Sequence, residues 1–263
     1  MRVREDEGSG TPVVLLHGQP GSAAEWSRIV PLLAGHDLRV LTVDRPGYGD
    51  DPEPARDWAG NVEALLAMFD ERGIDDAIVV GYSWAGGVAL EAALTAPDRV
   101  RGLVLMGSVG HPSALTRSDR VLAFRPVNRQ LSRVMNGLGS RAVTVLKAVS
   151  GSAVDQDGTS LLADEAAQFR ASGAWDSFAL EQDYFVRDAR QLAKRLRDVT
   201  TPAVLLHGWK DDVVPFKAGG ALAAALPNAR FEVVEGGHLL PLEHPDAVAR
   251  TVISFARSLE TAG

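Results

Sequence analysis

Cysteine is absent from this 263-residue sequence, which excludes disulfide bonds, a cysteine nucleophile and thiolate metal sites together. Apolar runs of membrane-spanning length are also missing, and the opening MRVREDEGSG lacks the apolar core of a secretory signal. We therefore expect a cytoplasmic location. The net charge of -7 gives no electrostatic reason to expect nucleic acid as a partner.

The sequence does contain enough apolar material for a sizeable core. Hydrophobic residues make up 46% of the chain and charged residues 23%, and both values are ordinary for a folded protein. A chain of this length forms either one large domain or two small ones.

Six short apolar runs, each followed by turn residues, predict buried parallel strands because they are apolar on both faces and rich in branched residues. Helical patterns lie between them, for example at 58–72, 84–96 and 218–226. This alternation predicts an α/β fold with a mostly parallel sheet and helices on both faces. The six runs are Pro12–Leu16, Leu38–Val43, Ala77–Val80, Arg101–Met106, Ala203–Leu206 and Phe231–Val234.

The alternation stops between residues 111 and 198, where helical patterns follow one another without a strand. We therefore expect a core made of residues 1–110 and 199–263, with an all-helical lid, residues 111–198, inserted after the strand at 101–106. One lid helix begins near Pro126 and carries an apolar stripe. That stripe is Val127, Leu131, Val134 and Leu138, and the other lid helices are predicted at 161–171, 175–187 and 189–197.

The segment Val79–Gly87, VVGYSWAGG, predicts a strand, a sharp turn at Ser83 and a helix that begins at once. Such a turn strains the backbone of the serine and exposes its hydroxyl. The residues two before and two after the serine pass close together, and both Gly81 and Ala85 are small. The first helical amides lie beside the serine, so the amide of Trp84 is placed to donate to an oxyanion. Taken alone, the segment also fits an ordinary strand-to-helix turn.

With four other segments, this turn resembles the α/β-hydrolase superfamily, specifically its lid-bearing branch with an HGxPG loop and a serine nucleophile. The resemblance covers nearly the whole chain. Ala85 stands where the family most often has glycine, and Asp212 replaces a frequent proline. Only one strand fits before Pro12, so we expect the first edge strand of the family to be missing. The segments are HGQPG at 17–21, DRPGYGDD at 44–51, GYSWAGG at 81–87, GWKDDVVP at 208–215 and GGHLLPLEHP at 236–245.

The resemblance implies a catalytic triad of Ser83, Asp211 and His238, in the nucleophile–acid–base order of this fold. A serine hydroxyl is a weak nucleophile, so His238 accepts its proton and later returns it to the leaving group. The carboxylate of Asp211 holds the imidazole in the correct tautomer and stabilises the imidazolium. Asp212 competes for the acid role, but the spacing from Pro215 favours Asp211.

The same resemblance implies that the HGQPG loop supplies a second oxyanion donor, the backbone amide of Gln19, beside that of Trp84. Asp44 and Arg45 are interpreted as a structural pair that shapes the loop after their strand. The histidines other than His238 fit structural or surface positions. They are His17 and His207 at strand ends, and His36, His111 and His244 in polar or loop contexts.

The lid sequence has two further features. The segment from Ser113 to Lys147 is basic apart from Asp119, which fits a solvated outer face, the interpretation we favour, or a patch for an anionic substrate or a membrane surface. Aromatic residues farther along either line an apolar pocket or form the core of the lid. The basic residues are Arg117, Arg120, Arg125, Arg129, Arg133, Arg141 and Lys147, and the aromatic ones are Trp175, Phe178, Tyr184 and Phe185.

The expected reaction is hydrolysis of a small or medium carboxylic ester or lactone through an acyl-enzyme. The substrate is expected to be a small molecule with an apolar acyl or aromatic part. A serine at position 83 argues against epoxide hydrolases and haloalkane dehalogenases, which the loop also resembles but which use an aspartate there. No residue cluster has metal-binding spacing and no glycine-rich loop has a nucleotide pattern, so we expect no metal and no cofactor.

Four alternatives remain open. The same triad serves hydrolases that cleave carbon–carbon bonds in diketone-like products of aromatic-ring breakdown. A proline-iminopeptidase-like enzyme needs a lid carboxylate for the free amine of its substrate, for which Glu165 and Glu181 are candidates. A hydroxynitrile-lyase-like enzyme releases cyanide, and a non-catalytic protein of this fold binds its ligand without turnover.

Overall fold

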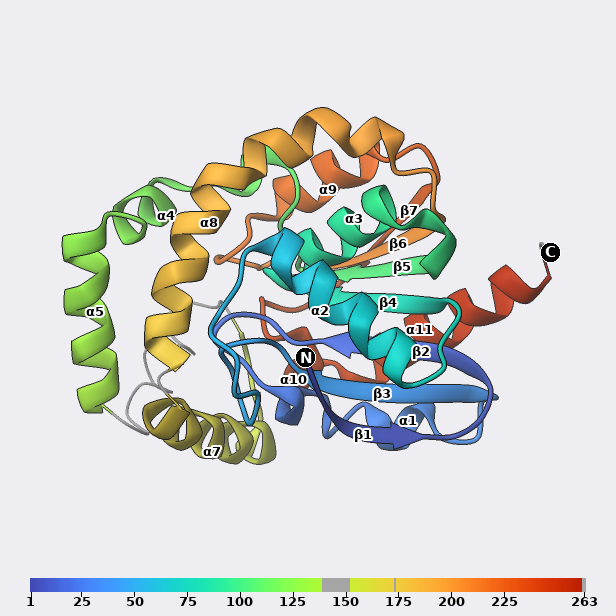
Figure 1. Cartoon of the computed structure of the whole chain (residues 1–263), viewed down its shortest axis with the longest axis horizontal. Helices are drawn as coiled ribbons and strands as arrows, with labels where there is room; N and C mark the ends of the chain where they lie inside the picture. Colours follow the sequence, from blue (N-terminus) through green and yellow to red (C-terminus); the bar gives the residue numbers. More distant parts are fainter. Residues whose placement is uncertain (139–151, 173, 262–263) are drawn as a thin grey trace.

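The computed structural model describes residues 1–138, 152–172 and 174–261 and is built around a seven-stranded sheet (Figure 1). The strands lie in the order β1-β3-β2-β4-β5-β6-β7, and only the β1–β3 pair is antiparallel. The predicted α/β fold with a mostly parallel sheet is confirmed. The strands are β1 (Arg2–Glu7), β2 (Thr11–Leu16), β3 (Leu38–Asp44), β4 (Ala77–Tyr82), β5 (Val100–Met106), β6 (Ala203–Gly208) and β7 (Ala229–Val234).

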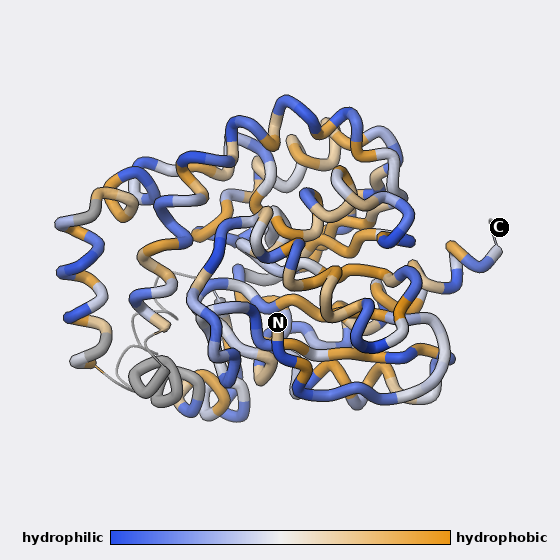
Figure 2. Tube along the Cα trace, viewed as in Figure 1, coloured by the Kyte–Doolittle hydropathy of each residue, from blue (hydrophilic) through white to orange (hydrophobic). Residues whose placement is uncertain are grey.

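The inner strands of the sheet are buried on both faces, and successive strand residues point to opposite sides. In β2, Val13 and Leu15 join one apolar core while Val14 and Leu16 join the other. Figure 2 shows the same pattern as a band of hydrophobic strands through the middle of the fold. The first core is closed by η1 (Ala23–Trp26), α1 (Val30–Leu33) and α11 (Pro245–Glu260), and the second by α2 (Trp58–Glu71), α3 (Ala85–Thr95) and α9 (Phe216–Ala225).

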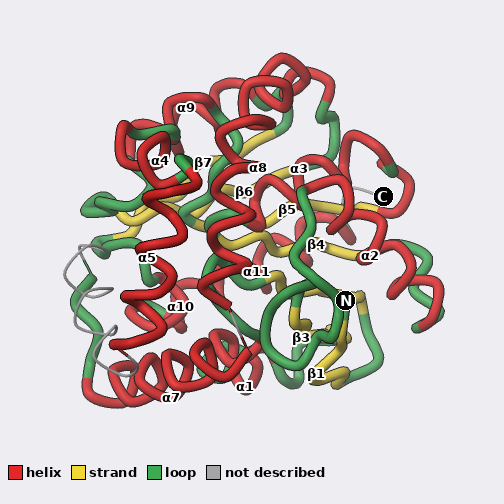
Figure 3. The backbone as a smooth tube through the Cα atoms, turned by 60° about the vertical axis from the view of Figure 1, so that its left-hand side comes forward, coloured by secondary structure: helices red, strands yellow, loops and turns green. Residues whose placement is uncertain are grey.

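Between β5 and β6 the chain forms helices that lie to one side of the sheet (Figures 1 and 3). We propose that residues 111–198 form a lid. Within the described residues, no helix is both long and apolar enough to cross a membrane. These elements are η3 (Pro112–Ala114), α4 (Arg117–Leu122), α5 (Arg125–Leu138), α7 (Gln156–Ser172), α8 (Ala174–Arg195) and η5 (Leu196–Asp198), and the remaining short helices are η2 (Pro97–Arg99) and α10 (Leu240–Glu243).

Helix α8 is continuous, whereas the sequence pattern predicted two helices at 175–187 and 189–197. In its first half, Trp175 packs in an apolar cluster with other lid residues such as Met135 and Leu162. Its second half packs against α3, and Phe185, Ala189 and Leu192 join the apolar core on that side of the sheet. One helix therefore connects the lid rigidly to the α/β core.

The apolar stripe predicted for α5 faces inward only in part: Leu131 and Leu138 pack against the buried cluster that contains Trp175, whereas the other two residues do not. Val127 and Val134 of the predicted stripe are 40% and 49% exposed. The buried positions include Asn128 and Ser132, whose side chains donate to the carbonyls of Ala179 and Trp175 in α8 at 2.7 and 3.0 Å. The helix is thus docked by hydrogen bonds between elements, which apolar periodicity cannot reveal.

Helix α3 approaches its neighbours closely at two glycines. A Cβ atom on Gly87 would lie 2.1 Å from the indole ring of Trp58 in α2, and one on Gly86 would lie 2.4 Å from Ser108 after β5. A glycine inside a helix costs about 1 kcal/mol relative to alanine. Glycine is nevertheless favourable at these two positions, because no larger residue fits in the space.

We predict that Gly87→Ala lowers the free energy of unfolding by about 1–3 kcal/mol, because the added methyl group overpacks the site against Trp58. Gly220→Ala in α9 is the matched control, since its Cβ would meet no atom closer than 3.9 Å and alanine favours a helix. It should raise stability by about 0.5–1 kcal/mol. Urea unfolding followed by circular dichroism measures both, and equal effects of the two substitutions would contradict the packing argument.

Candidate active site

The candidate site lies at the carboxyl ends of the parallel strands, where the loops after β4, β6 and β7 meet. Ser83 follows β4, Asp211 follows β6 and His238 follows β7. Residues 155 positions apart in the chain, Ser83 and His238, are therefore brought into contact.

The turn that carries Ser83 has the strained geometry predicted for it. Ser83 has φ 54°, in the left-handed region that side-chain-bearing residues avoid. Its amide donates to the carbonyl of Met106 in β5 at 2.9 Å, and its own carbonyl accepts from Val109 at 3.1 Å. Helix α3 begins two residues later, so the amide of Trp84 lies in the first turn, where no intrahelical acceptor exists.

Ser83, His238 and Asp211 form one continuous hydrogen-bonded line. The Oγ atom of Ser83 lies 2.9 Å from Nε2 of His238, and Nδ1 of His238 lies 2.8 Å from Oδ2 of Asp211. All three side chains are buried, with residue exposures of 5–6%. An imidazole that donates from Nδ1 to the carboxylate must accept at Nε2, which is the tautomer a general base needs.

The surroundings of Asp211 keep it ionised. Its Oδ1 accepts from the amides of Val213 and Val214 at 2.9 and 2.8 Å. Burial would raise the pKa of the Asp211 carboxyl, but the charge of a protonated His238 and hydrogen bonds from His207 and His238 outweigh burial and hold this pKa well below its usual range. Asp212 is exposed, so geometry favours Asp211 as the acid.

The histidine loop is held by the nucleophile strand itself. The hydroxyl of Tyr82, next to Ser83, donates to the carbonyl of His238 at 3.0 Å. Gly107 leaves room on the other side, because a Cβ there would lie 3.2 Å from Nδ1 of His238 and its φ is +48°. The imidazole is thus packed between the ends of two strands.

Residues of the HGQPG loop lie over the nucleophile. A Cβ on Gly18 would lie 3.2 Å from Cβ of Ser83, so the loop backbone passes directly beside it. Gln19 and Trp84, the two expected oxyanion donors, line the same cavity as Ser83 and His238. The two residues expected to donate, which come from separate loops, therefore border one space.

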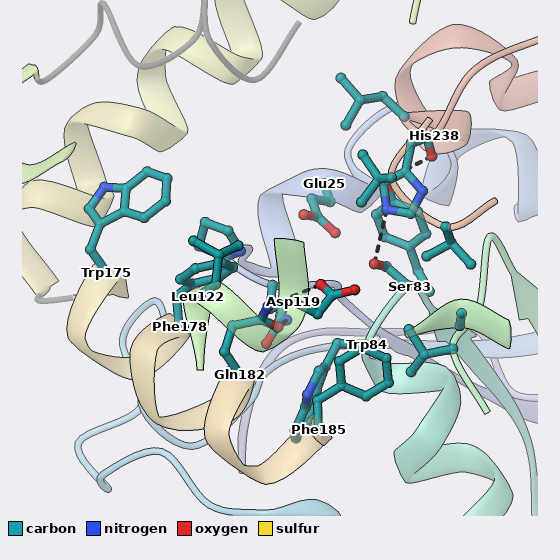
Figure 4. Close-up of a pocket in the computed structure, with 18 of the residues that line it drawn as sticks. Glu25, Ser83, Trp84, Asp119, Leu122, Trp175, Phe178, Gln182, Phe185 and His238 are labelled. Atoms are coloured by element: carbon teal, nitrogen blue, oxygen red, sulfur yellow. Dashed lines mark hydrogen bonds between the residues drawn. The ribbon is translucent and has the colours of Figure 1, made fainter. Parts of the chain in front are cut away.

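The cavity above Ser83 has a volume of about 340 Å³. Figure 4 shows Ser83 and His238 at one end, and Trp175 and Phe178 at the other. Phe185 and Trp84 line the wall between them. Trp175, Phe178 and Phe185 thus line a pocket and also pack in the apolar clusters of the fold. The ring of Tyr184 instead faces Arg187.

A polar chain that the sequence did not reveal crosses this pocket. Asp119 of α4 accepts from Nε2 of Gln182 at 3.2 Å, and Oε1 of Gln182 accepts from Nε2 of Gln19 at 2.7 Å. Asp119 is itself fixed by a capping box with Thr116. The only sequence signal was the Thr-x-x-Asp spacing of the box, which does not show that Asp119 faces a pocket.

Asp44 and Arg45 do not pair with each other. Asp44 accepts from the amides of Ala23 and Asp50 at 2.8 and 2.9 Å. Arg45 turns into the interior and forms a fully buried ion pair with Glu181 of the lid helix α8. The pairing of Arg45 was missed because its partner lies 136 residues away.

The remaining predicted residues fall into two groups. His17 and His207 are buried and hydrogen-bonded, in agreement with a structural role.

The described part of the basic segment faces solvent at Arg117, Arg120, Arg129 and Arg133. Arg141, Lys147 and the side chain of Arg125 lie outside the described residues. Among the residues that the structure describes, no group of three His, Asp or Glu side chains could hold a metal ion.

Comparisons with known proteins agree with the fold of this chain. The family model described as "alpha/beta hydrolase fold" matches residues 11–245. A 2-hydroxymuconate semialdehyde hydrolase of Pseudomonas putida is 29% identical over 265 residues, which cover 95% of this chain and 88% of that protein. A pimeloyl-[acyl-carrier protein] methyl ester esterase of Pectobacterium atrosepticum is 33% identical, with coverage of 97% and 98%. A thermophilic esterase from Thermogutta terrifontis superposes with a TM-score of 0.80 at 20% identity, covering 97% of this chain and 92% of its own.

We predict that Asp211→Asn lowers kcat by about 10³–10⁴-fold, because the amide no longer holds the imidazole in its accepting tautomer. Asp212→Asn is the matched control and should change kcat by less than about threefold. Steady-state kinetics on any substrate that the wild type turns over checks the pair. A larger loss in Asp212→Asn than in Asp211→Asn would exclude the assignment.

Acid unfolding should report the lowered pKa of Asp211. Because this pKa is lower in the folded state than in the unfolded chain, where it is about 3.9, the ionised carboxylate stabilises the fold at higher pH. That contribution is lost progressively as pH falls from about 4 toward the lower pKa of the folded state. The gap in unfolding free energy between wild type and Asp211→Asn should therefore narrow between pH 5 and pH 3. Urea titrations across this range test it, and a gap independent of pH would contradict the shift.

Proposed function

Since this chain belongs to the α/β-hydrolase family and is a serine hydrolase, we propose that Ser83, His238 and Asp211 are its catalytic triad. The observation that supports this assignment is the hydrogen-bonded line from Oγ of Ser83 through His238 to Asp211, at one end of an apolar cavity. We further propose that this triad hydrolyses a carbonyl compound through an acyl-enzyme.

The first half of the reaction forms the acyl-enzyme. Oγ of Ser83 attacks the carbonyl carbon while its proton passes to Nε2 of His238. The negative charge that develops on the carbonyl oxygen is stabilised by the amides of Gln19 and Trp84. When the tetrahedral intermediate collapses, His238 gives its proton to the departing group. Water then attacks the ester of Ser83 by the same steps, releasing an acid and restoring the serine.

For the bond that breaks, we propose first a carbon–carbon bond in a diketone-like compound. The relative from Pseudomonas putida is named for a semialdehyde rather than an ester, and this favours carbon–carbon cleavage over the ester interpretation that the sequence alone suggested. In such a substrate the electron pair of the broken bond delocalises onto the second carbonyl oxygen. The proton held by His238 then completes the ketone product.

Ester hydrolysis is the second candidate. The relative from Pectobacterium atrosepticum is named as a methyl ester esterase and aligns along 97% of this chain. The chemistry needs the same acyl-enzyme, with an alkoxide as the departing group that His238 protonates. The two candidates differ only in what leaves, so the triad geometry by itself is compatible with both.

The walls of the cavity favour an uncharged substrate with an apolar or aromatic body. Trp175, Phe178 and Phe185 supply apolar surface, and the volume of about 340 Å³ fits a small molecule. Two carboxylates, Glu25 and Asp119, line the cavity, and among its described lining residues there is no lysine or arginine. A substrate carboxylate near the reacting carbonyl would therefore be repelled.

The proline-iminopeptidase alternative loses one of its two candidate carboxylates. Glu181 is fully buried and paired with Arg45, so it does not face the cavity to bind a free amine. The side chain of Glu165 lies outside the described residues. Hydroxynitrile cleavage and ligand binding without turnover have no specific observation in their favour.

We predict that the wild-type protein cleaves an uncharged phenyl-substituted 1,3-diketone or short to medium p-nitrophenyl esters, and that Ser83→Ala loses at least 10³-fold in kcat. A diketone that carries a carboxylate beside the reacting carbonyl should have at least tenfold lower kcat/KM than the uncharged compound. Product analysis by liquid chromatography distinguishes carbon–carbon from ester cleavage. If the folded wild type binds these compounds, as measured by calorimetry, but does not turn them over, the enzymatic proposal is refuted.

A further inference from the structure

A fully buried ion pair joins the lid helix to the core beneath the HGQPG loop. Arg45, after β3, and Glu181, in the middle of α8, both have side chains with 0% exposure. Nη1 of Arg45 contacts Oε1 of Glu181, and the hydroxyl of Tyr48 donates to Oε2 of Glu181 at 2.7 Å. The guanidinium is stacked between the rings of Tyr48 and Trp84, at 4.8 and 4.7 Å.

Such a pair needs an explanation beyond stability. Removing two charges from water is costly, and buried ion pairs are often no more stabilising than apolar side chains of the same size. The remaining contacts of the Arg45 guanidinium show what the charge holds in place. Its Nε donates to the carbonyl of His17 at 3.0 Å, and its Nη2 donates to the carbonyl of Gly18 at 2.7 Å.

The Gly18 carbonyl belongs to the same peptide group as the amide of Gln19. A second donor reaches this carbonyl, because Nδ1 of His17 lies 2.8 Å from it. The amide of Arg45 donates to Nε2 of His17 at 3.0 Å, so the single ring proton of a neutral His17 is on Nδ1. On the other side of Gly18, its amide donates to Glu25 at 3.1 Å. The peptide groups on both sides of Gly18 are thus fixed by side chains.

A trans peptide group is planar, and its N–H points away from its C=O. Two donors that anchor the Gly18 carbonyl on the Arg45 side therefore direct the Gln19 N–H to the opposite side. A cationic donor on the carbonyl also polarises the peptide, which makes the N–H a stronger hydrogen-bond donor. Both effects strengthen an oxyanion hole.

We infer that Arg45 and Glu181 are positioning residues for the oxyanion hole, through which the lid helix α8 sets the direction of the Gln19 amide. This inference rests on the proposed function. Glu181 also contacts the other expected donor residue, because Nε1 of Trp84 donates to the Glu181 carbonyl at 3.3 Å. One residue of α8 thus contacts the side chain of Trp84 directly and the HGQPG loop through Arg45.

The test compares Arg45→Lys and Glu181→Gln with a matched control, Arg187→Ala. Arg187 is also on α8 and also pairs with a core residue, Asp57, at 3.0 Å, but this pair is exposed and no contact of Arg187 involves the HGQPG loop. For each variant we would measure kcat and KM, the inhibition constant of an aryl trifluoromethyl ketone, and the melting temperature. The ketone forms a tetrahedral adduct with Ser83 whose oxyanion occupies the hole.

Lysine keeps the charge of Arg45 but not the planar fork that contacts two carbonyls and a carboxylate. We expect Arg45→Lys to lower kcat by about 10–100-fold, less than the 10²–10³-fold typical for loss of a whole oxyanion donor. The affinity for the trifluoromethyl ketone should fall by the same factor, with KM within about twofold of wild type. The kcat and the ketone affinity of Glu181→Gln should lie between those of Arg45→Lys and wild type. Arg187→Ala should change kcat by less than threefold.

A purely structural role would lower the melting temperature without a parallel loss of kcat and ketone affinity, and that result would overturn the inference. If Arg45→Lys does not fold, Tyr48→Phe removes a single hydrogen bond to Glu181 and should show the same parallel loss on a smaller scale. A wild type that neither turns over substrate nor is labelled at Ser83 by a fluorophosphonate would refute the proposed function instead. The two failures are therefore distinguishable.

Discussion

The left-handed backbone of Ser83 is the constraint around which the site is organised. This conformation costs about 1–2 kcal/mol for a residue with a side chain, and hydrogen bonds from the neighbouring strand stabilise it. The serine amide is held by Met106, and Oγ of Ser108 donates to the carbonyl of Gly81 at 2.9 Å. The segment after β5 thus braces the turn, and the nucleophile is presented by two strands rather than by a mobile loop.

Much of the core could be predicted from the sequence because its signals are local. The strands are short apolar runs that end in turn residues, and the parallel sheet brings their carboxyl ends together. The resemblance to the α/β-hydrolase superfamily singled out Ser83, Asp211 and His238, and each of them follows one of these strand ends. The preference for Asp211 over Asp212 also followed from spacing, and the structure shows Asp211 against His238 and Asp212 in solvent.

The lid was predicted less well because its packing depends on contacts between distant segments. Apolar periodicity predicted that Val127 and Val134 face inward, but hydrogen bonds from Asn128 and Ser132 to α8 turn them outward. Arg45 and Glu181 each look like ordinary charged residues in the sequence. Their pairing depends on the angle at which α8 crosses the core, and no local pattern encodes that angle.

Neighbouring positions on α8 serve different parts of the molecule. Gln182 faces the cavity, whereas Glu181 faces Arg45 in the interior. A lid grafted from another protein of this architecture would leave Arg45 with an unpaired buried charge unless that lid also supplied a carboxylate. The unpaired charge would lower the free energy of unfolding by about 3–5 kcal/mol. A substitution on the cavity side of this helix therefore leaves the ion pair intact, whereas a change of charge at Glu181 must be matched by a change at Arg45.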